Sequence, residues 1–243
     1  MPAERIAVLD DARGAAVVLM IIYHFFFDLN YFGFAPVDMQ SLLFVLFQRI
    51  IGTSFVLIAG ISLAISESRN REGYVHHAKR GLRLAAVAAL ITLATWAYPH
   101  EGFIQFGIIH MLALSTLIAP FFFRFGKLNI ILGAAIVLLG FYASTMTTAS
   151  HWLFWLGITY PGYYALDHYP MLPWFGVVLI GICVGQAVLA RWKGREEKIR
   201  KSVVARAWHA RALSFLGRNS LAIYLLHQPV LVGILLAFRS LFP

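Results

Sequence analysis

The chain has 243 residues, of which 60% are hydrophobic and only 13% are charged. Soluble domains contain roughly 45–50% apolar and about 25% charged residues, so the composition excludes a soluble protein and predicts a polytopic membrane protein. The net charge of +9 could suit a nucleic acid, but the basic residues follow the pattern of a membrane topology signal. At this length we expect one domain over residues 1–243.

Seven apolar stretches are long enough to approach a membrane crossing, which takes about 20 helical residues. They lie at 14–34, 42–66, 82–98, 105–123, 129–147, 171–190 and 219–239. The first stretch is a full span that follows charged residues and has no small-residue cleavage site, so we do not expect a signal peptide. The predicted fold is an all-α bundle of about seven transmembrane helices.

Lysine and arginine gather in alternate connections. Of the 20 basic residues, 18 precede the first span or follow the second, fourth and sixth, and the exceptions are Arg49 and Arg239. The positive-inside rule then places the N-terminus in the cytoplasm and the C-terminus on the far side. The basic excess therefore indicates topology and contact with anionic lipids, and no nucleic-acid partner is expected.

Two connections and the cysteine content add to this outline. Residues 191–218 mix basic and apolar side chains, which is typical of a helix lying along the inner membrane surface, with binding of a phosphate-rich ligand as the alternative. Residues 148–170 are interrupted by Gly and Pro and rich in aromatics, which fits a lid, a re-entrant segment or an aromatic interface belt. The single cysteine, Cys183, allows no intramolecular disulfide.

The first span carries two ionisable residues, His24 and Asp28, four positions apart on one helix face. Ionisable groups cost at least ~2.5 kcal/mol each at this depth, so they indicate a functional site. A carboxylate beside a histidine holds one ring nitrogen and leaves the other as a general base. Arg13 precedes His24 by three helical turns, or roughly 16 Å, on the same stripe. The alternatives are a histidine that only bonds a neighbouring helix and an arginine that only marks topology.

Other spans place polar groups at a similar depth, and we expect them to converge with His24 on one hydrated cavity that opens outward. These candidates for substrate or cavity contacts are Arg49, His110, Tyr224 and His227. A salt bridge of Arg49 with Asp28 is the structural alternative for that pair, and His227 alternatively marks only a bend before Pro229. Neither a Gly-rich phosphate loop nor an H-E-x-x-H motif nor a cysteine pair occurs, so no metal is expected.

The stretch LDDARGAAVVLMIIYHFFFDL (9–29) resembles the heparan-alpha-glucosaminide N-acetyltransferase-like integral-membrane family. The same pattern continues in FVLIAGISLAIS (55–66), FGIIHMLALS (106–115), PWFGVVLIGICVG (173–185) and LGRNSLAIYLLHQPV (216–230). The chain is also similar to bacterial membrane acyltransferases that modify surface sugars, whose first helix has a basic residue, ten residues and then histidine, as Arg13 and His24 do. The resemblance implies a multi-pass acyltransferase of the bacterial inner membrane.

The resemblance also implies acetyl-CoA from the cytosol as co-substrate and an acceptor hydroxyl or amine, expected to belong to a sugar, on the outer side. His24 would then be the general base, oriented by Asp28, and Asn219 or Arg49 would steady the oxyanion. The residues expected to bind the acyl-CoA are Arg13, Arg80, Arg83, Arg124, Lys127 and Asn219. Two other functions stay open, a proton-coupled transporter that uses His24, Asp28 and Arg49 as a relay, and a non-catalytic membrane scaffold. The oligomeric state is open as well, with a homo-oligomer among the alternatives.

Overall fold

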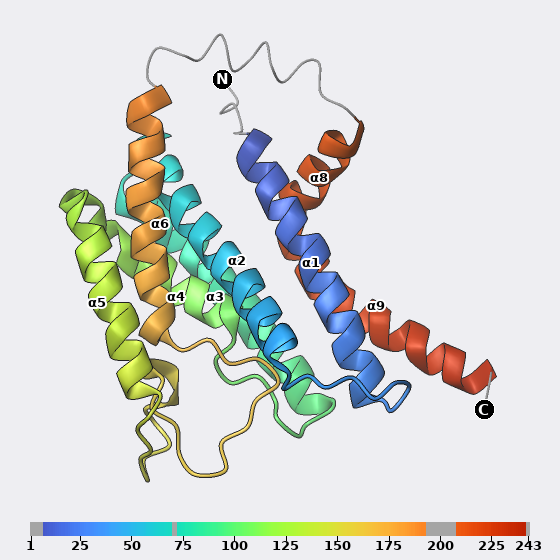
Figure 1. The fold of residues 1–243 in the computed structure, drawn as a ribbon. Coiled ribbons are helices and arrows are strands. Elements are labelled where there is room, and N and C mark those ends of the chain that lie inside the picture. Colours follow the sequence, from blue (N-terminus) through green and yellow to red (C-terminus); the bar gives the residue numbers. More distant parts are fainter. Residues whose placement is uncertain (1–6, 70–71, 193–207, 242–243) are drawn as a thin grey trace. The chain divides into compact units, whose positions relative to one another are not determined.

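The computed structural model describes residues 7–69, 72–192 and 208–241, and nearly all regular structure in this part of the chain is helical (Figure 1). The prediction of an all-α fold is therefore confirmed. Six elements are long and apolar enough to cross a membrane. They are α1 (Ala7–Tyr31), α2 (Leu42–Arg69), α3 (Tyr74–Ala97), α4 with the 3-10 helix η1 (Ile108–Ile118 and Ala119–Phe125), α6 (Met171–Trp192) and α9 (Ser220–Leu241).

The remaining predicted span, at 129–147, corresponds to α5 (Leu128–Ala143), which has 16 residues and falls short of a full crossing by length. It nevertheless packs closely on α6, because glycines replace side chains at the crossing. A Cβ atom added at Gly133 would lie 2.6 Å from the Gly176 carbonyl oxygen. Small residues at such crossings allow apolar helices to pack by close backbone approach. The prediction of about seven membrane helices is thus close to the described architecture.

The chain divides into two compact units, and each is described by itself. Unit 1 comprises residues 1–58 and 194–243, and unit 2 comprises residues 59–193. In unit 1, α1 packs against α9 and against the short helix α8 (Trp208–Arg218). In unit 2, α5 packs on α6 and α3 packs on α4. The expectation of a single domain over 1–243 stays a prediction.

The connection 148–170 contains no helix longer than the three-residue η2 (Phe154–Leu156). It is held to the connection 99–107, where the Leu166 N–H donates to a backbone carbonyl at 2.8 Å. The Asp167 carboxylate accepts a hydrogen bond from the backbone N–H of Ile108, the first residue of α4, at 3.0 Å. The first N–H groups of a helix have no partner inside it, so Asp167 supplies one. The segment is therefore an ordered loop that caps α4.

A tyrosine–histidine pair lies inside this loop. The Tyr163 hydroxyl and His168 Nδ1 are hydrogen-bonded at 3.0 Å, and their rings meet edge to face. Burial lowers the pKa of His168 to about 4, because the protonated ring would lose its hydration. His168 is therefore neutral in the folded protein near neutral pH.

The segment predicted to lie along the inner surface, 191–218, is described only in part. Residues 193–207 lie outside the described residues, and the last part forms α8, with Ser214 and Gly217 buried in unit 1. That this segment lies along the membrane stays a prediction.

Candidate functional site

Two membrane helices of unit 1 bring four polar side chains together. The His24 ring on α1 meets the His227 ring on α9 edge to face, with centroids 4.7 Å apart. One position further along α9, Gln228 Nε2 donates a hydrogen bond to Asp28 Oδ1 at 2.6 Å. Asp28 is only 1% exposed. These four residues are called the His–Asp cluster below, and they join segments that are 200 residues apart in the sequence.

Backbone carbonyls determine which nitrogen of each histidine is free. His24 Nδ1 lies 2.9 Å from the Met20 carbonyl oxygen, and His227 Nδ1 lies 2.6 Å from that of Tyr224. Because a carbonyl oxygen can only accept, each Nδ1 carries the hydrogen and each neutral ring presents Nε2 as an acceptor. Both histidines of the His–Asp cluster are therefore in the tautomer that a general base at Nε2 requires.

The His–Asp cluster also contains polar atoms that lack partners. In the described part of the chain, six buried side-chain polar atoms have no hydrogen-bond partner, and three of them are Asp28 Oδ2, His227 Nε2 and Gln228 Oε1. Buried polar atoms are nearly always hydrogen-bonded, so three such atoms in one place indicate where a ligand or water binds. All three are acceptors in this arrangement, as is His24 Nε2.

The predicted pairing inside α1 is wrong in detail. Asp28 does not hold the His24 ring, because the Met20 carbonyl one turn earlier already takes the Nδ1 hydrogen. The alternative salt bridge between Asp28 and Arg49 is not formed either, since Gln228 is the partner of Asp28 among the described residues. Arg49 itself lies exposed on α2. The carboxylate that should orient His24 instead joins α1 to α9.

Tyr224 and His227 were both expected in the cavity, and the structure places them side by side on α9. Their ring centroids are 5.7 Å apart. The Tyr224 carbonyl also fixes the His227 ring, as described above. His227 is therefore more than the mark of a bend, although Pro229 does lie inside α9.

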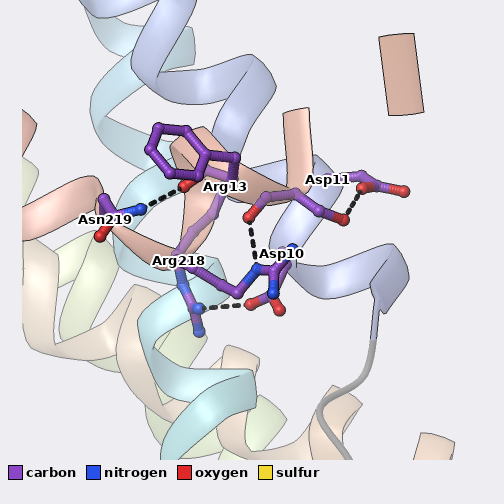
Figure 2. A network of polar contacts seen from close by, with 7 residues as sticks. Asp10, Asp11, Arg13, Arg218 and Asn219 are labelled. Atoms are coloured by element: carbon purple, nitrogen blue, oxygen red, sulfur yellow. Dashed lines mark hydrogen bonds and ion pairs between the residues drawn. The ribbon is translucent and has the colours of Figure 1, made fainter. Parts of the chain in front are cut away.

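The start of α1 forms a second polar network with α8, drawn in Figure 2. Arg13 pairs with Asp10 at 3.2 Å, so the predicted phosphate contact also holds a buried carboxylate on its own helix. The Ser214 hydroxyl donates to Asp11 at 2.5 Å, which ties α8 to α1. Arg218 Nε donates to the Ser214 carbonyl oxygen at 3.1 Å. These residues, with Asn219, are called the α1–α8 network below.

Glycines bring the two helices of the α1–α8 network into backbone contact. A Cβ atom added at Gly14 would overlap the Leu213 carbonyl oxygen, and one added at Gly217 would overlap the Asp10 carbonyl oxygen. Each glycine is flanked by one arginine of the network, at positions 13 and 218. The close crossing therefore holds both arginines near each other.

Asn219 lies at the junction of α8 and α9, where its Nδ2 donates to the Phe215 carbonyl oxygen at 2.9 Å. It precedes His227 by eight residues, or about 12 Å along the helix. That Asn219 steadies an oxyanion at the His–Asp cluster stays a prediction, as does its expected contact with acyl-CoA from its place in the α1–α8 network.

His110 lies in unit 2 and belongs to a saturated network. Its Nδ1 accepts from the Gly107 N–H at 3.3 Å, and its Nε2 bonds to Thr92 Oγ1 at 3.0 Å. Thr92 Oγ1 donates in turn to the Ile104 carbonyl oxygen at 2.7 Å. His110 lines an apolar groove of about 570 Å³ between α3 and α4, but neither ring nitrogen is left for a substrate. Its role here is to hold α4 to α3.

The four other basic residues expected to bind acyl-CoA gather at one end of unit 2. Ring contacts of Tyr74 with Phe121 and of His77 with Phe123 bring the start of α3 against η1. Arg80 and Arg83 lie on the first half of α3, Arg124 lies in η1 and Lys127 directly precedes α5. That these four share one CoA site with Arg13 and Asn219 stays a prediction.

The sequence interpretation missed Gln228 as the partner of Asp28, and it missed Ser214 and Arg218 in the α1–α8 network. Two signals could have indicated them. A glutamine inside an apolar span needs a polar partner, and a glycine beside an arginine on each of two helices suits a close crossing. In the described residues, no group of three His, Cys, Asp or Glu side chains could hold a metal ion.

Comparison with known proteins gives one match. The family model described as "Heparan-alpha-glucosaminide N-acetyltransferase, catalytic" matches residues 5–229, which include the His–Asp cluster and the α1–α8 network. No curated protein and no solved structure matches the chain. Together with the six apolar helices, the match over most of the chain confirms the resemblance seen in the sequence. The chain is a multi-pass membrane protein that belongs to the heparan-alpha-glucosaminide N-acetyltransferase catalytic family, a family of membrane acetyltransferases.

Proposed function

We propose that this protein transfers an acetyl group from cytosolic acetyl-CoA to the amine of a sugar-containing acceptor on the far side of the membrane, with His24 as general base. The observation that supports this most directly is the His–Asp cluster. Its His24 Nε2 is unengaged among the described residues, while Nδ1 is fixed by the Met20 carbonyl. A base held in one tautomer and aimed by its backbone partner is what proton abstraction requires.

The excess of hydrogen-bond acceptors in the His–Asp cluster favours an amine over a hydroxyl as the group that receives the acetyl. The unpartnered buried atoms of Asp28, His227 and Gln228 are all acceptors, and His24 Nε2 adds a fourth. An ammonium group offers three N–H donors and a positive charge beside the Asp28 carboxylate, whereas a hydroxyl offers one donor. The name of the matching family, an N-acetyltransferase of glucosaminides, points the same way.

The two histidines also supply the proton acceptors that an amine requires. An ammonium must lose one proton before it can attack, and the attacking amine loses a second as the amide forms. His227 Nε2 would take the first proton and His24 Nε2 the second. The new C–N bond then replaces the C–S bond, and the departing thiolate takes a proton from the His24 imidazolium to become CoA thiol. The proton on His227 leaves to solvent, so one proton is released per turnover.

The test is acetyl transfer by the purified protein in lipid nanodiscs. With acetyl-CoA and glucosamine, the wild type should release CoA thiol and form an acetamide, detected by mass spectrometry, and glucose should give no ester. His24→Ala should lower the rate by about 10²–10⁴, the usual share of general-base catalysis. The matched control is His209→Ala, an exposed histidine of unit 1 that should keep its rate.

A second readout separates lost chemistry from lost binding. CoA should raise the melting temperature of wild type and His24→Ala equally, because the variant keeps the donor site. If His24→Ala transfers acetyl at nearly the wild-type rate, His24 is not the base. If the wild type forms no acetamide and gains no stability from CoA, the acetyltransferase proposal is wrong. Proton-coupled uptake lost in His24→Ala would then support a transporter.

A further inference from the structure

The α1–α8 network contains an arginine, Arg218, to which the sequence interpretation gave no role beyond its place in the basic segment 191–218. Arg218 closes α8, its side chain is exposed, and its Nε is bonded to the Ser214 carbonyl. Among the described residues, no Asp or Glu lies within ion-pair distance of its guanidinium. The bond at Nε orients the group and leaves the two terminal nitrogens with four N–H donors. A fixed, exposed fork of this kind suits a phosphate.

The position of Arg218 is fixed relative to α1 by two independent contacts. The Ser214 whose carbonyl holds Arg218 is itself bonded through its hydroxyl to Asp11. The second contact is made by the neighbouring Gly217, which lies directly against the backbone of Asp10, so that α8 and α1 touch through their backbones at this crossing. Figure 2 shows Arg218 and Arg13 in the same close view with Asp10. Arg13 on α1 and Arg218 on α8 therefore lie at the same helix crossing.

Helix geometry gives the distance from this crossing to the His–Asp cluster. His24 follows Arg13 by eleven residues on α1, or about 16 Å, and His227 follows Ser220, the first residue of α9, by seven residues, or about 10 Å. A pantetheine chain has twelve bonds between its phosphate oxygen and its sulfur. Three backbone bonds span at most 3.3–3.6 Å in an extended chain, so twelve span about 14 Å. The extended pantetheine chain, at about 14 Å, is therefore intermediate in length between the distance of about 16 Å along α1 and that of about 10 Å along α9.

We infer that Arg218, together with Arg13, binds the diphosphate of the acyl-CoA donor, so that one extended pantetheine arm reaches from the α1–α8 network to the His–Asp cluster. This inference rests on the proposed acetyl-CoA donor. It adds a donor-binding residue on α8 and names the group that it recognises. The 3′-phosphate lies beyond the diphosphate on the nucleotide, outside the span of the arm.

The experiment compares donors that differ in phosphate. The variants are Arg218→Ala and, as a matched control, Arg239→Ala, an exposed arginine at the far end of α9. The donors are acetyl-CoA, acetyl-dephospho-CoA, which keeps the diphosphate, and S-acetylpantetheine, which has no phosphate. Arg218→Ala should raise the KM for the first two by about 10- to 100-fold, the effect of losing hydrogen bonds to a charged group. Its kinetics with S-acetylpantetheine and all those of Arg239→Ala should match the wild type.

Binding gives a readout that does not depend on turnover. CoA and dephospho-CoA should stabilise the wild type against heating, and Arg218→Ala should need about 10- to 100-fold more of either for the same shift. Arg218→Lys should recover only part of the loss, because an ammonium cannot make the paired contacts of a guanidinium.

Three outcomes would overturn the inference while the wild type stays active. If Arg218→Ala raises the KM equally for all three donors, Arg218 has a structural role or binds a phospholipid headgroup. If changing the anionic lipid content of the nanodiscs removes that effect, the headgroup is its ligand. A loss with acetyl-CoA but not with acetyl-dephospho-CoA would assign Arg218 to the 3′-phosphate. No loss with any donor would exclude a donor contact. Absence of transfer in the wild type would instead count against the proposed function.

Discussion

Replacing Gln228 by Leu tests the contact that joins the two helices of the candidate site. The substitution keeps the side-chain size but removes the N–H group that donates to Asp28 at 2.6 Å. Asp28 is 1% exposed and its second oxygen already lacks a partner, so both oxygens would then be unpaired. A hydrogen bond to a charged group contributes about 1.5–3 kcal/mol, whereas neutral bonds between membrane helices average about 0.6 and reach about 1.7 kcal/mol. Because the acceptor is a carboxylate, we expect the free energy of unfolding to fall by about 2 kcal/mol.

A double-mutant cycle isolates this bond. Gln228→Leu, Asp28→Leu and the double variant would be unfolded reversibly in mixed detergent micelles, and the coupling energy would be read from the four free energies of unfolding. We expect about 1.5–2 kcal/mol of coupling. Gln48→Leu, an exposed glutamine on α2, is the matched control and should change stability little. A coupling energy below about 0.5 kcal/mol would mean that the two side chains are not bonded in the membrane.

Three further predictions concern other parts of the chain. His110→Ala should destabilise unit 2 yet keep acetyl transfer, because both ring nitrogens are already bonded, and a rate loss of a hundredfold in nanodiscs would contradict this. The melting temperature should fall as the pH is lowered from about 6.5 to about 4, since in that range only unfolded His168 binds a proton; His168→Phe should flatten this decline, and parallel curves for both proteins would refute the reasoning. In a Cys183→Ser background, an impermeant maleimide added outside cells should label Glu101→Cys but not Lys127→Cys, and the reverse pattern would invert the predicted topology.

The helices could be read from the sequence because apolar length alone decides where a chain can cross a membrane. The exact helix ends differ by several residues. The start of α1 at Ala7 includes Asp10 and Arg13, whose charges make the sequence look like a flanking segment. These charges are accommodated in the folded chain, because Asp10 and Arg13 pair with each other on α1 and the neighbouring Asp11 accepts a hydrogen bond from Ser214 on α8.

The candidate site could be predicted only in part. The polar residues inside the spans indicated that His24 and Asp28 matter, but helical periodicity shows which residues share a face and not which atoms bond. The His24 ring bonds to the Met20 carbonyl and not to Asp28, and Asp28 bonds to Gln228 on the last helix of the chain. Nothing in the sequence marks the Met20 carbonyl, since a backbone carbonyl is present at every residue. Gln228 is marked as a polar residue in an apolar span, but its partner is 200 positions away and is not indicated by local sequence.

The separation of Asp28 and Gln228 along the chain has a consequence for biosynthesis. The first helix enters the membrane long before α9 is made, so its carboxylate meets the bilayer without the glutamine that holds it in the folded protein. An unpaired Asp costs about 2.5–3.5 kcal/mol at the centre of a span on insertion scales, and Asp28, one turn before the end of α1, carries part of that cost. A chain that stops before α9 would keep this cost and would lack His227 as well. Arrival of the last helix therefore both completes the site and removes the strain of inserting the first, which makes an unfinished chain less stably inserted than the complete one.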